Sequence, residues 1–180
     1  TQNWSNLGLI TTANVWTAVP GIEGYNGADG STTASGIDPQ TVLVVPPNNA
    51  LNVSPNQTTP NTNTAGGVVE FEIADPVVAL QGSGTADFPH LLIALNTTGA
   101  SSVRVRYRVR DIDGSADNAI QPVALQYRVG DSGSFINVPE AFIADASTGP
   151  SLADLVTPVD VLLPGATANQ PLVQLRVITS

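Results

Sequence analysis

The sequence contains no lysine, no cysteine and no methionine, and its only histidine is His90. Without cysteine there are no disulfides, and without a group of His or Cys residues a structural zinc site has no ligands. Nucleophilic catalysis would need a serine or threonine with His90 as its base, but the chain has no Gly-x-Ser-x-Gly elbow. We therefore expect no enzymatic activity and no catalytic residue.

Charge is also scarce and mostly of one sign. Charged residues make up 12% of the chain, and the formal net charge is −9. A protein without a basic footprint is a poor nonspecific ligand of nucleic acid, and an acidic protein is not drawn to anionic lipid. No apolar run approaches the length of a membrane span. We therefore expect no nucleic-acid partner and no insertion into a membrane.

The remaining polar residues are mostly Asn, Gln, Ser and Thr, a composition common on secreted proteins. The chain begins at Thr1 rather than at methionine. A cleaved secretory signal would leave such a start, and so would trimming of a longer chain. We predict a secreted protein, either extracellular or at the cell surface.

The chain of 180 residues has no internal repeat and no linker, which predicts one domain over residues 1–180. Helical periodicity is nearly absent. Short β-rich segments instead recur about every ten residues between clusters of Gly, Pro, Asn and Asp, as in sandwiches and barrels. The predicted strands lie within residues 6–12, 41–45, 66–75, 76–82, 90–96, 102–112, 122–130, 134–139, 141–146, 158–164 and 171–179.

Several predicted strands alternate apolar and polar residues, as half-buried strands do. Val69 and Phe71 share one face, opposite Glu70 and Glu72. This pattern predicts an all-β fold, an antiparallel β-sandwich of two packed sheets.

Other segments refine this prediction. Residues 90–95 and 76–80 are apolar on both faces and predict central strands. Residues 20–40 and 46–65 are predicted long N-terminal loops, the second with one short strand at 51–53.

Four of the six basic residues form one alternating row, Arg104, Arg106, Arg108 and Arg110. Residues two apart on a strand point to the same side, so the row faces away from the intervening apolar residues. At about 3.3 Å per residue, the four guanidinium groups span roughly 20 Å. Because like charges at this spacing repel each other, carboxylates must lie nearby.

Two interpretations of the row stay open. In the first, neighbouring strands supply the acids, with Glu70 and Glu72 as candidates, and each exposed pair contributes a few tenths of a kcal/mol to about 1 kcal/mol. In the second, the row binds an acidic partner, and another copy of this acidic protein is the natural candidate. Arginine suits such an interface because it forms bidentate pairs. The row is therefore the candidate partner-binding site.

The row runs into an oxygen-rich segment that contains Asp111, Asp113 and Asp117. Calcium takes such carboxylate ligands, although Gly114 comes too early for an EF-hand loop. Asx-rich turns use the same residues only to cap backbone groups. Both interpretations stay open: a calcium site formed by Asp111, Asp113 and Asp117, or a plain turn in which Asp111 pairs with Arg110 or a neighbour.

Aromatic residues make up 5% of the chain, which is few for a protein that binds sugar on aromatic platforms. Trp4, Trp16 and Tyr25 lie outside the strongly alternating strands. We expect them to plug the ends of the sandwich rather than to stack on sugar. A surface glycan is kept as an alternative partner.

Taken together, residues 3–25, 66–99, 110–130 and 163–180 carry a family resemblance. They resemble the β-rich N-terminal domain of large secreted bacterial proteins that also carry lamin-tail, calcium-binding β or endonuclease/exonuclease/phosphatase modules. The resemblance covers most of the chain. It implies a jelly-roll-like sandwich in a secreted or cell-surface bacterial protein, and it implies no catalytic residue in this domain.

The chain departs from those relatives in two ways. They have a less basic strand in place of RVRYRVR, and they continue past the last strand with an acidic, Trp-containing segment, whereas this chain ends at Ser180. A sandwich that lacks its last strand exposes an unpaired edge, which a strand from a neighbour can fill. Head-to-tail exchange of this kind would give a filament, with residues 1–12 as the predicted donor.

These features together predict a non-enzymatic extracellular β-sandwich that serves as a structural or adhesive unit of the bacterial cell surface and self-associates. Two alternatives stay open. One is an accessory or targeting module of a secreted nuclease or phosphodiesterase. The other is a calcium-dependent carbohydrate-binding module.

Overall fold

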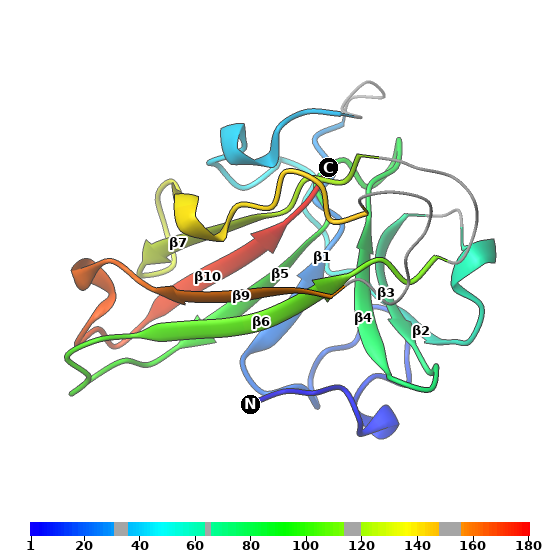
Figure 1. The fold of residues 1–180 in the computed structure, drawn as a ribbon, viewed down its shortest axis with the longest axis horizontal. Helices are drawn as coiled ribbons and strands as arrows, with labels where there is room; N and C mark the ends of the chain where they lie inside the picture. Colours follow the sequence, from blue (N-terminus) through cyan, green and yellow to red (C-terminus); the bar gives the residue numbers. More distant parts are fainter. Residues whose placement is uncertain (31–35, 64–65, 114–119, 148–155) are drawn as a thin grey trace.

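The computed structural model describes residues 1–30, 36–63, 66–113, 120–147 and 156–180. It consists of β-strands and short 3-10 helices, and its sheets pack against one another (Figure 1), which confirms the predicted all-β sandwich class. The 3-10 helices are η1 (Leu7–Leu9), η2 (Pro39–Thr41), η3 (Pro60–Thr62), η4 (Pro139–Ala141) and η5 (Gly165–Thr167).

The largest sheet has five antiparallel strands in the order β1-β5-β10-β7-β8. These strands are β1 (Ile22–Tyr25), β5 (His90–Leu95), β10 (Val173–Ile178), β7 (Ala124–Val129) and β8 (Ile136–Asn137). The chain reaches the centre of the sheet last, since β10 is inserted between β5 and β7. Long-range pairing therefore completes the sheet.

A two-stranded antiparallel ribbon forms a separate layer in front of this sheet (Figure 1). It consists of β6 (Arg104–Arg110) and β9 (Val156–Leu162), and we call it the β6–β9 ribbon. Neither strand pairs with a third strand among the described residues. Both long edges of the ribbon are therefore free in that part of the chain.

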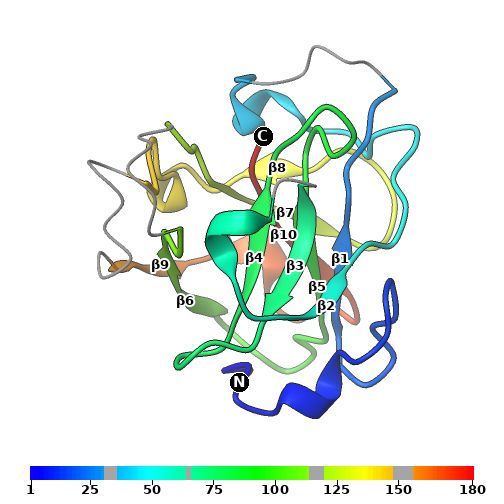
Figure 2. The ribbon, with the colours of Figure 1, turned by 90° about the vertical axis from the view of Figure 1, so that its right-hand side faces the viewer.

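A three-stranded sheet lies beside these two layers, facing the viewer in Figure 2. Its strands are β2 (Ser54–Gln57), β3 (Gly67–Phe71) and β4 (Val77–Gln81), with β2 parallel and β4 antiparallel to β3. All five residues of β3 are buried. The expected polar face of this strand is therefore covered, and Glu70 is only 4% exposed.

The main core lies between the five-stranded sheet and the β6–β9 ribbon. Alternate residues of β7 and β10, such as Leu125 and Leu175, pack in one cluster with Val159 and Val161 of β9. These side chains are almost completely removed from water. The same period of two turns the arginines of β6 away from the core.

A second core cluster ties the N-terminal segment to its own molecule. Ile10 and Trp16 are buried with Val68, and Trp4 and Leu9 pack against them. The strand predicted at residues 6–12 was wrong, because this stretch contains η1, which begins after Asn6 caps it. The predicted donor segment thus lies on the core of its own chain.

Other predictions about single strands also need correction. Residues 41–45 form no strand, because carbonyl groups at Val42 and Val44 accept hydrogen bonds from the Arg176 side chain instead of from a neighbouring strand. Residues 141–146 contribute a single bridge, between Ile143 and Val123. β1 (Ile22–Tyr25) lies inside the predicted loop 20–40, where no strand was predicted.

The predictions of central strands were half right. β5 lies between β1 and β10, as expected of a strand that is apolar on both faces. β4 lies at an edge of the three-stranded sheet, and its residues are only partly buried. The described residues contain no helix that is long and apolar enough to cross a membrane.

Candidate functional site

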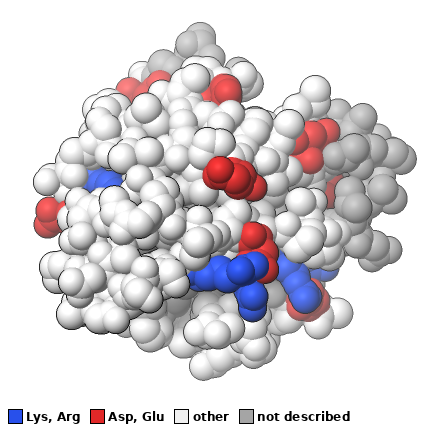
Figure 3. All heavy atoms as spheres, turned by 60° about the vertical axis from the view of Figure 1, so that its left-hand side comes forward, with Lys and Arg blue, Asp and Glu red and all other residues white. Residues whose placement is uncertain are grey.

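The outer face of the β6–β9 ribbon carries the arginine row. The row alternates with Val105, Tyr107 and Val109, of which Val105 and Tyr107 pack toward the main core. Opposite the row, β9 presents Leu162, Asp160, Pro158 and Val156, each facing one arginine in the register of the ribbon. The structure thus confirms that Arg104, Arg106, Arg108 and Arg110 share one face. Figure 3 shows most of the visible basic groups in one band, with acidic groups touching it.

Carboxylates from two other elements offset part of this charge. Arg104 and Arg106 share Asp160, at 2.5 Å and 3.1 Å from their Nε atoms. Hydrogen bonds from these two arginines lower the pKa of Asp160 to about 2. Arg110 reaches both the carboxylate and the main-chain oxygen of Asp75. These acids lie on the solvent side, so the pairs contribute little to stability.

Arg108 differs from the other three arginines of the row in its lack of an acidic partner among the described residues. It is exposed and makes no ion pair with another described residue. Its cross-strand neighbour is Pro158, which offers no charge. Arg106, Arg108, Pro158 and Asp160 line a shallow depression of about 310 Å³. A carboxylate in this depression would lie beside the guanidinium groups of Arg106, which already pairs with Asp160, and of Arg108, which has no such partner among the described residues.

Glu70 and Glu72 are not the partners of the row. They lie at β3, which pairs with β2 and β4 and not with β6. Glu70 accepts a hydrogen bond from the main-chain nitrogen of Asn56 at 2.6 Å, and burial raises its pKa. Sequence alternation identified the outward side of β6, but the pairing of strands decided which acid faces it.

The candidate calcium ligands are only partly described. The main-chain nitrogen of Asp113 donates to Oδ1 of Asp111 at 2.9 Å, which is the Asx-turn geometry. Asp117 lies outside the described residues. No group of three or more His, Cys, Asp or Glu residues that could hold a metal is present in the described part of the chain. Arg110 pairs with Asp75 and not with Asp111.

The structure contains a buried arginine that no sequence pattern predicted. Arg176 of β10 has no exposed surface. Its Nε donates to Oε1 of Gln126 at 2.8 Å, and its terminal nitrogens donate to the main-chain oxygens of Val42 and Val44. Its guanidinium carbon lies 4.1 Å from the centre of the Phe135 ring. Burial lowers the pKa of Arg176 to about 9.

A second arginine stacks on the same ring. The guanidinium carbon of Arg128 lies 4.5 Å from the centre of the Phe135 ring, and its Nε donates to Gln174 at 2.7 Å. These contacts attach the segments around Val42 and Phe135 to the face of the five-stranded sheet that points away from the ribbon. Arg128 and Arg176 therefore hold the fold together and are not free to bind a partner.

His90 is a buried structural residue. Its Nδ1 lies 2.8 Å from the main-chain oxygen of Phe88, and its ring stacks on Tyr25. Burial lowers the pKa of His90 to about 3, so the ring is neutral at pH 7. The backbone packs closely beside this contact, since a Cβ atom on Gly27 would lie 1.8 Å from the main-chain oxygen of Phe88. No hydroxyl group of the described residues is hydrogen-bonded to His90.

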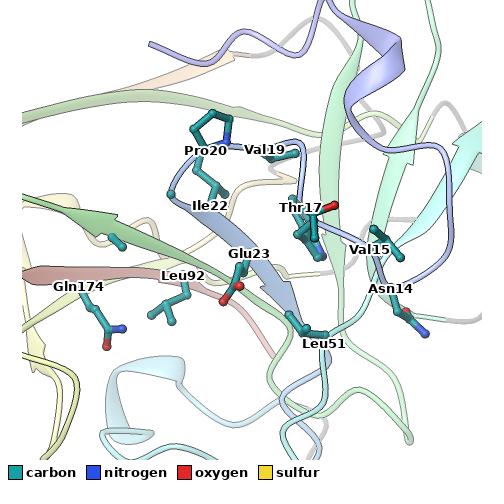
Figure 4. A pocket seen from close by; sticks show the side chains of 13 residues that line it. Asn14, Val15, Thr17, Val19, Pro20, Ile22, Glu23, Leu51, Leu92 and Gln174 are labelled. Carbon is teal, nitrogen blue, oxygen red and sulfur yellow. The ribbon is translucent and has the colours of Figure 1, made fainter.

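A shallow groove of about 470 Å³ lies beside β1 (Figure 4). Val15, Pro20 and Ile22 supply apolar surface, and Glu23 and Gln174 supply polar groups. Glu23 already accepts a hydrogen bond from the Tyr25 hydroxyl at 2.7 Å. The groove has no aromatic platform, since Trp16 is buried and donates its indole N–H to Asn52. It shows no feature that selects a sugar.

Comparisons with protein-family models, with curated proteins and with solved structures found no match for this chain. The resemblance to domains of large secreted bacterial proteins therefore stays a prediction. The candidate site rests on the geometry of the β6–β9 ribbon.

Proposed function

We propose that the protein is a non-enzymatic, extracellular structural or adhesive unit of the bacterial cell surface that associates with further copies of itself through the β6–β9 ribbon. One observation carries the proposal. A chain of net charge −9 places four of its six basic residues on a single face of one strand, and three of them, Arg104, Arg106 and Arg108, are exposed. Arg108 in that face has no carboxylate partner among the described residues.

The composition of the face supports a protein partner. Leu162 and Val156 are exposed beside the arginines, by 62% and 42%. Arginine next to apolar side chains is typical of the surfaces on which proteins meet. The acidic remainder of a second copy complements the row, and charge complementarity speeds association and fixes orientation.

Assembly by exchange of the N-terminal segment would require native contacts to break. Ile10 is buried, and Trp4 and Leu9 pack with it on the second core cluster. Passing residues 1–12 to a neighbour would expose these apolar groups until the exchange is complete. We therefore place the contact on the ribbon, where no native contact has to be broken.

The double variant Arg106→Gln/Arg108→Gln should weaken self-association at least about tenfold, because it removes the charges that attract an acidic surface. Light scattering and negative-stain microscopy at low and high salt measure this, and high salt should weaken the native assembly in the same direction. Thermal unfolding of the variant should change little, since Arg106 is 69% exposed.

A matched control separates the site from overall charge. Thr11→Glu/Ala13→Glu changes the net charge by the same amount at exposed positions away from the ribbon. This control should assemble as the unmodified protein does. Native protein that stays monomeric in both salt conditions would rule out the proposed self-association.

A further inference from the structure

The hydrogen-bonding pattern of the β6–β9 ribbon shows which backbone groups point outward. The main-chain nitrogen of Leu163 donates to the oxygen of Val103 at 2.9 Å. In an antiparallel ladder, hydrogen-bonded pairs alternate with pairs that are not hydrogen-bonded. When the register is extended from this pair, the main-chain groups of the odd-numbered residues of β6 are the ones that form hydrogen bonds with β9. The even residues therefore turn their N–H and C=O groups toward the free edge.

The arginine row thus coincides with the free backbone groups. Arg104, Arg106, Arg108 and Arg110 carry both the guanidinium groups and the outward N–H and C=O groups of β6. No other described segment forms a backbone hydrogen bond with this edge. A strand added here would place side chains opposite the arginines at cross-strand distance, on the same face of the ribbon.

The other edge of the ribbon is blocked. Pro158 pairs with Arg108, so its nitrogen points outward from β9. Proline has no N–H, and a proline in the middle of an edge strand prevents another strand from adding to it. Only the β6 edge can therefore accept a strand along its full length.

A second copy of β6 cannot be that strand. In a symmetric antiparallel pair, one set of registers places arginines directly opposite arginines, and like charges in that position are destabilising. The other set places arginines beside the valines of the partner, so that the core-facing side of one copy points to the solvent side of the other. The occupant must be a different segment.

We propose that the free edge of β6 binds an extended peptide segment that carries carboxylates at every second residue. Same-face residues on any strand lie about 6.7 Å apart, so acids with this period match each arginine in turn. Arg108, which lacks an acid on β9, gains one from the added strand. The inference rests on the proposed function only in taking the ribbon as the contact surface.

Two synthetic peptides of one composition test this inference on the full chain. The first alternates glutamate with threonine and valine, and the second has its glutamates in one consecutive run. Fluorescence polarisation should show the alternating peptide binding about tenfold more tightly, because only its acids align with the arginines. A uronate polysaccharide serves as a third probe of the same charge sign.

Three protein variants complete the test. Arg108→Pro removes an N–H that the ribbon does not use, and it should abolish binding of the alternating peptide. Arg106→Gln/Arg108→Gln should abolish the preference for that peptide. If the proline variant does not fold, this double variant alone tests whether the arginines select the alternating peptide. Thr11→Glu/Ala13→Glu should keep the preference.

The possible results separate the two proposals. Equal binding of both peptides, no peptide binding, or binding of the polysaccharide alone would overturn the strand-acceptor inference. Native protein that assembles without preferring the alternating peptide would leave the proposed self-association standing. Monomeric protein with a clear preference for the alternating peptide would overturn the proposed self-association and support the strand-acceptor inference.

Discussion

Replacing Arg176 with alanine is expected to lower the free energy of unfolding by about 3–5 kcal/mol, because the change opens a cavity and strips donors from buried acceptors. The side chain has no exposed surface, and it supplies hydrogen bonds to Gln126 and to the main chain at Val42 and Val44. For a domain of this size, that loss corresponds to a fall in melting temperature of about 10 °C.

Burying the charge of Arg176 has a cost in free energy. Removing the charge should therefore offset part of the stability that is lost with the side chain. Burial leaves the charged form of Arg176 poorly solvated and lowers its pKa, and no carboxylate pairs with it in the described structure. Replacing a buried charge with an apolar group of similar volume is often tolerated. Arg176→Met should therefore destabilise less than Arg176→Ala, because methionine fills the space and carries no charge.

Thermal and urea unfolding of both variants measure the effect. Arg104→Ala is the matched control, since it removes an exposed guanidinium group that pairs with Asp160 and should change the free energy of unfolding little. If Arg176→Ala and Arg104→Ala have the same stability, the buried arginine does not hold the loop segments to the sheet.

Acidification from pH 7 to pH 5 is expected to remove about 2 kcal/mol of stability through His90 alone. The pKa of His90 is about 3 in the folded protein, against an ordinary value of 6.5. Between these values the unfolded chain binds one more proton than the folded chain, so stability falls as the pH falls through this window. The loss continues to about pH 3.

His90→Asn isolates this contribution. The asparagine amide can replace the Nδ1 donor toward the oxygen of Phe88, and it does not titrate. Urea unfolding at pH 7 and pH 5 should show the difference in stability shrinking by about 2 kcal/mol in the variant. Asp145 and Asp160, whose pKa values are lowered, act at lower pH and equally in both proteins. Equal pH dependence of the two proteins would show that the fold does not lower the pKa of His90.

Local patterns predicted the strands whose side chains alternate strongly. β6, β7 and β10 fall within their predicted ranges, because apolar residues at every second position indicate a strand with one face on the core. β1 was missed because its four residues include Gly24 and show no clear alternation. It is a strand because it pairs with β5, which is a long-range contact.

The candidate site was predictable in part for the same reason. The sequence placed the arginine row on one face of one strand, but it could not name Asp160 as the partner, since that depends on the register between β6 and β9. Arg176 carried no local signal. In its strand it occupies an ordinary outward position, and only the return of the segment around Val42 buries it.

The distribution of basic residues also determines how a protease meets this protein. Trypsin cleaves after lysine or arginine, and here all six basic residues are arginines that lie in β6, β7 or β10. Bonds within paired strands are cut only after the strand opens locally. Digestion of the folded protein should therefore proceed only as fast as these strands open. An occupant of the β6 edge would slow cleavage at the four sites of that strand and leave those after Arg128 and Arg176 unchanged.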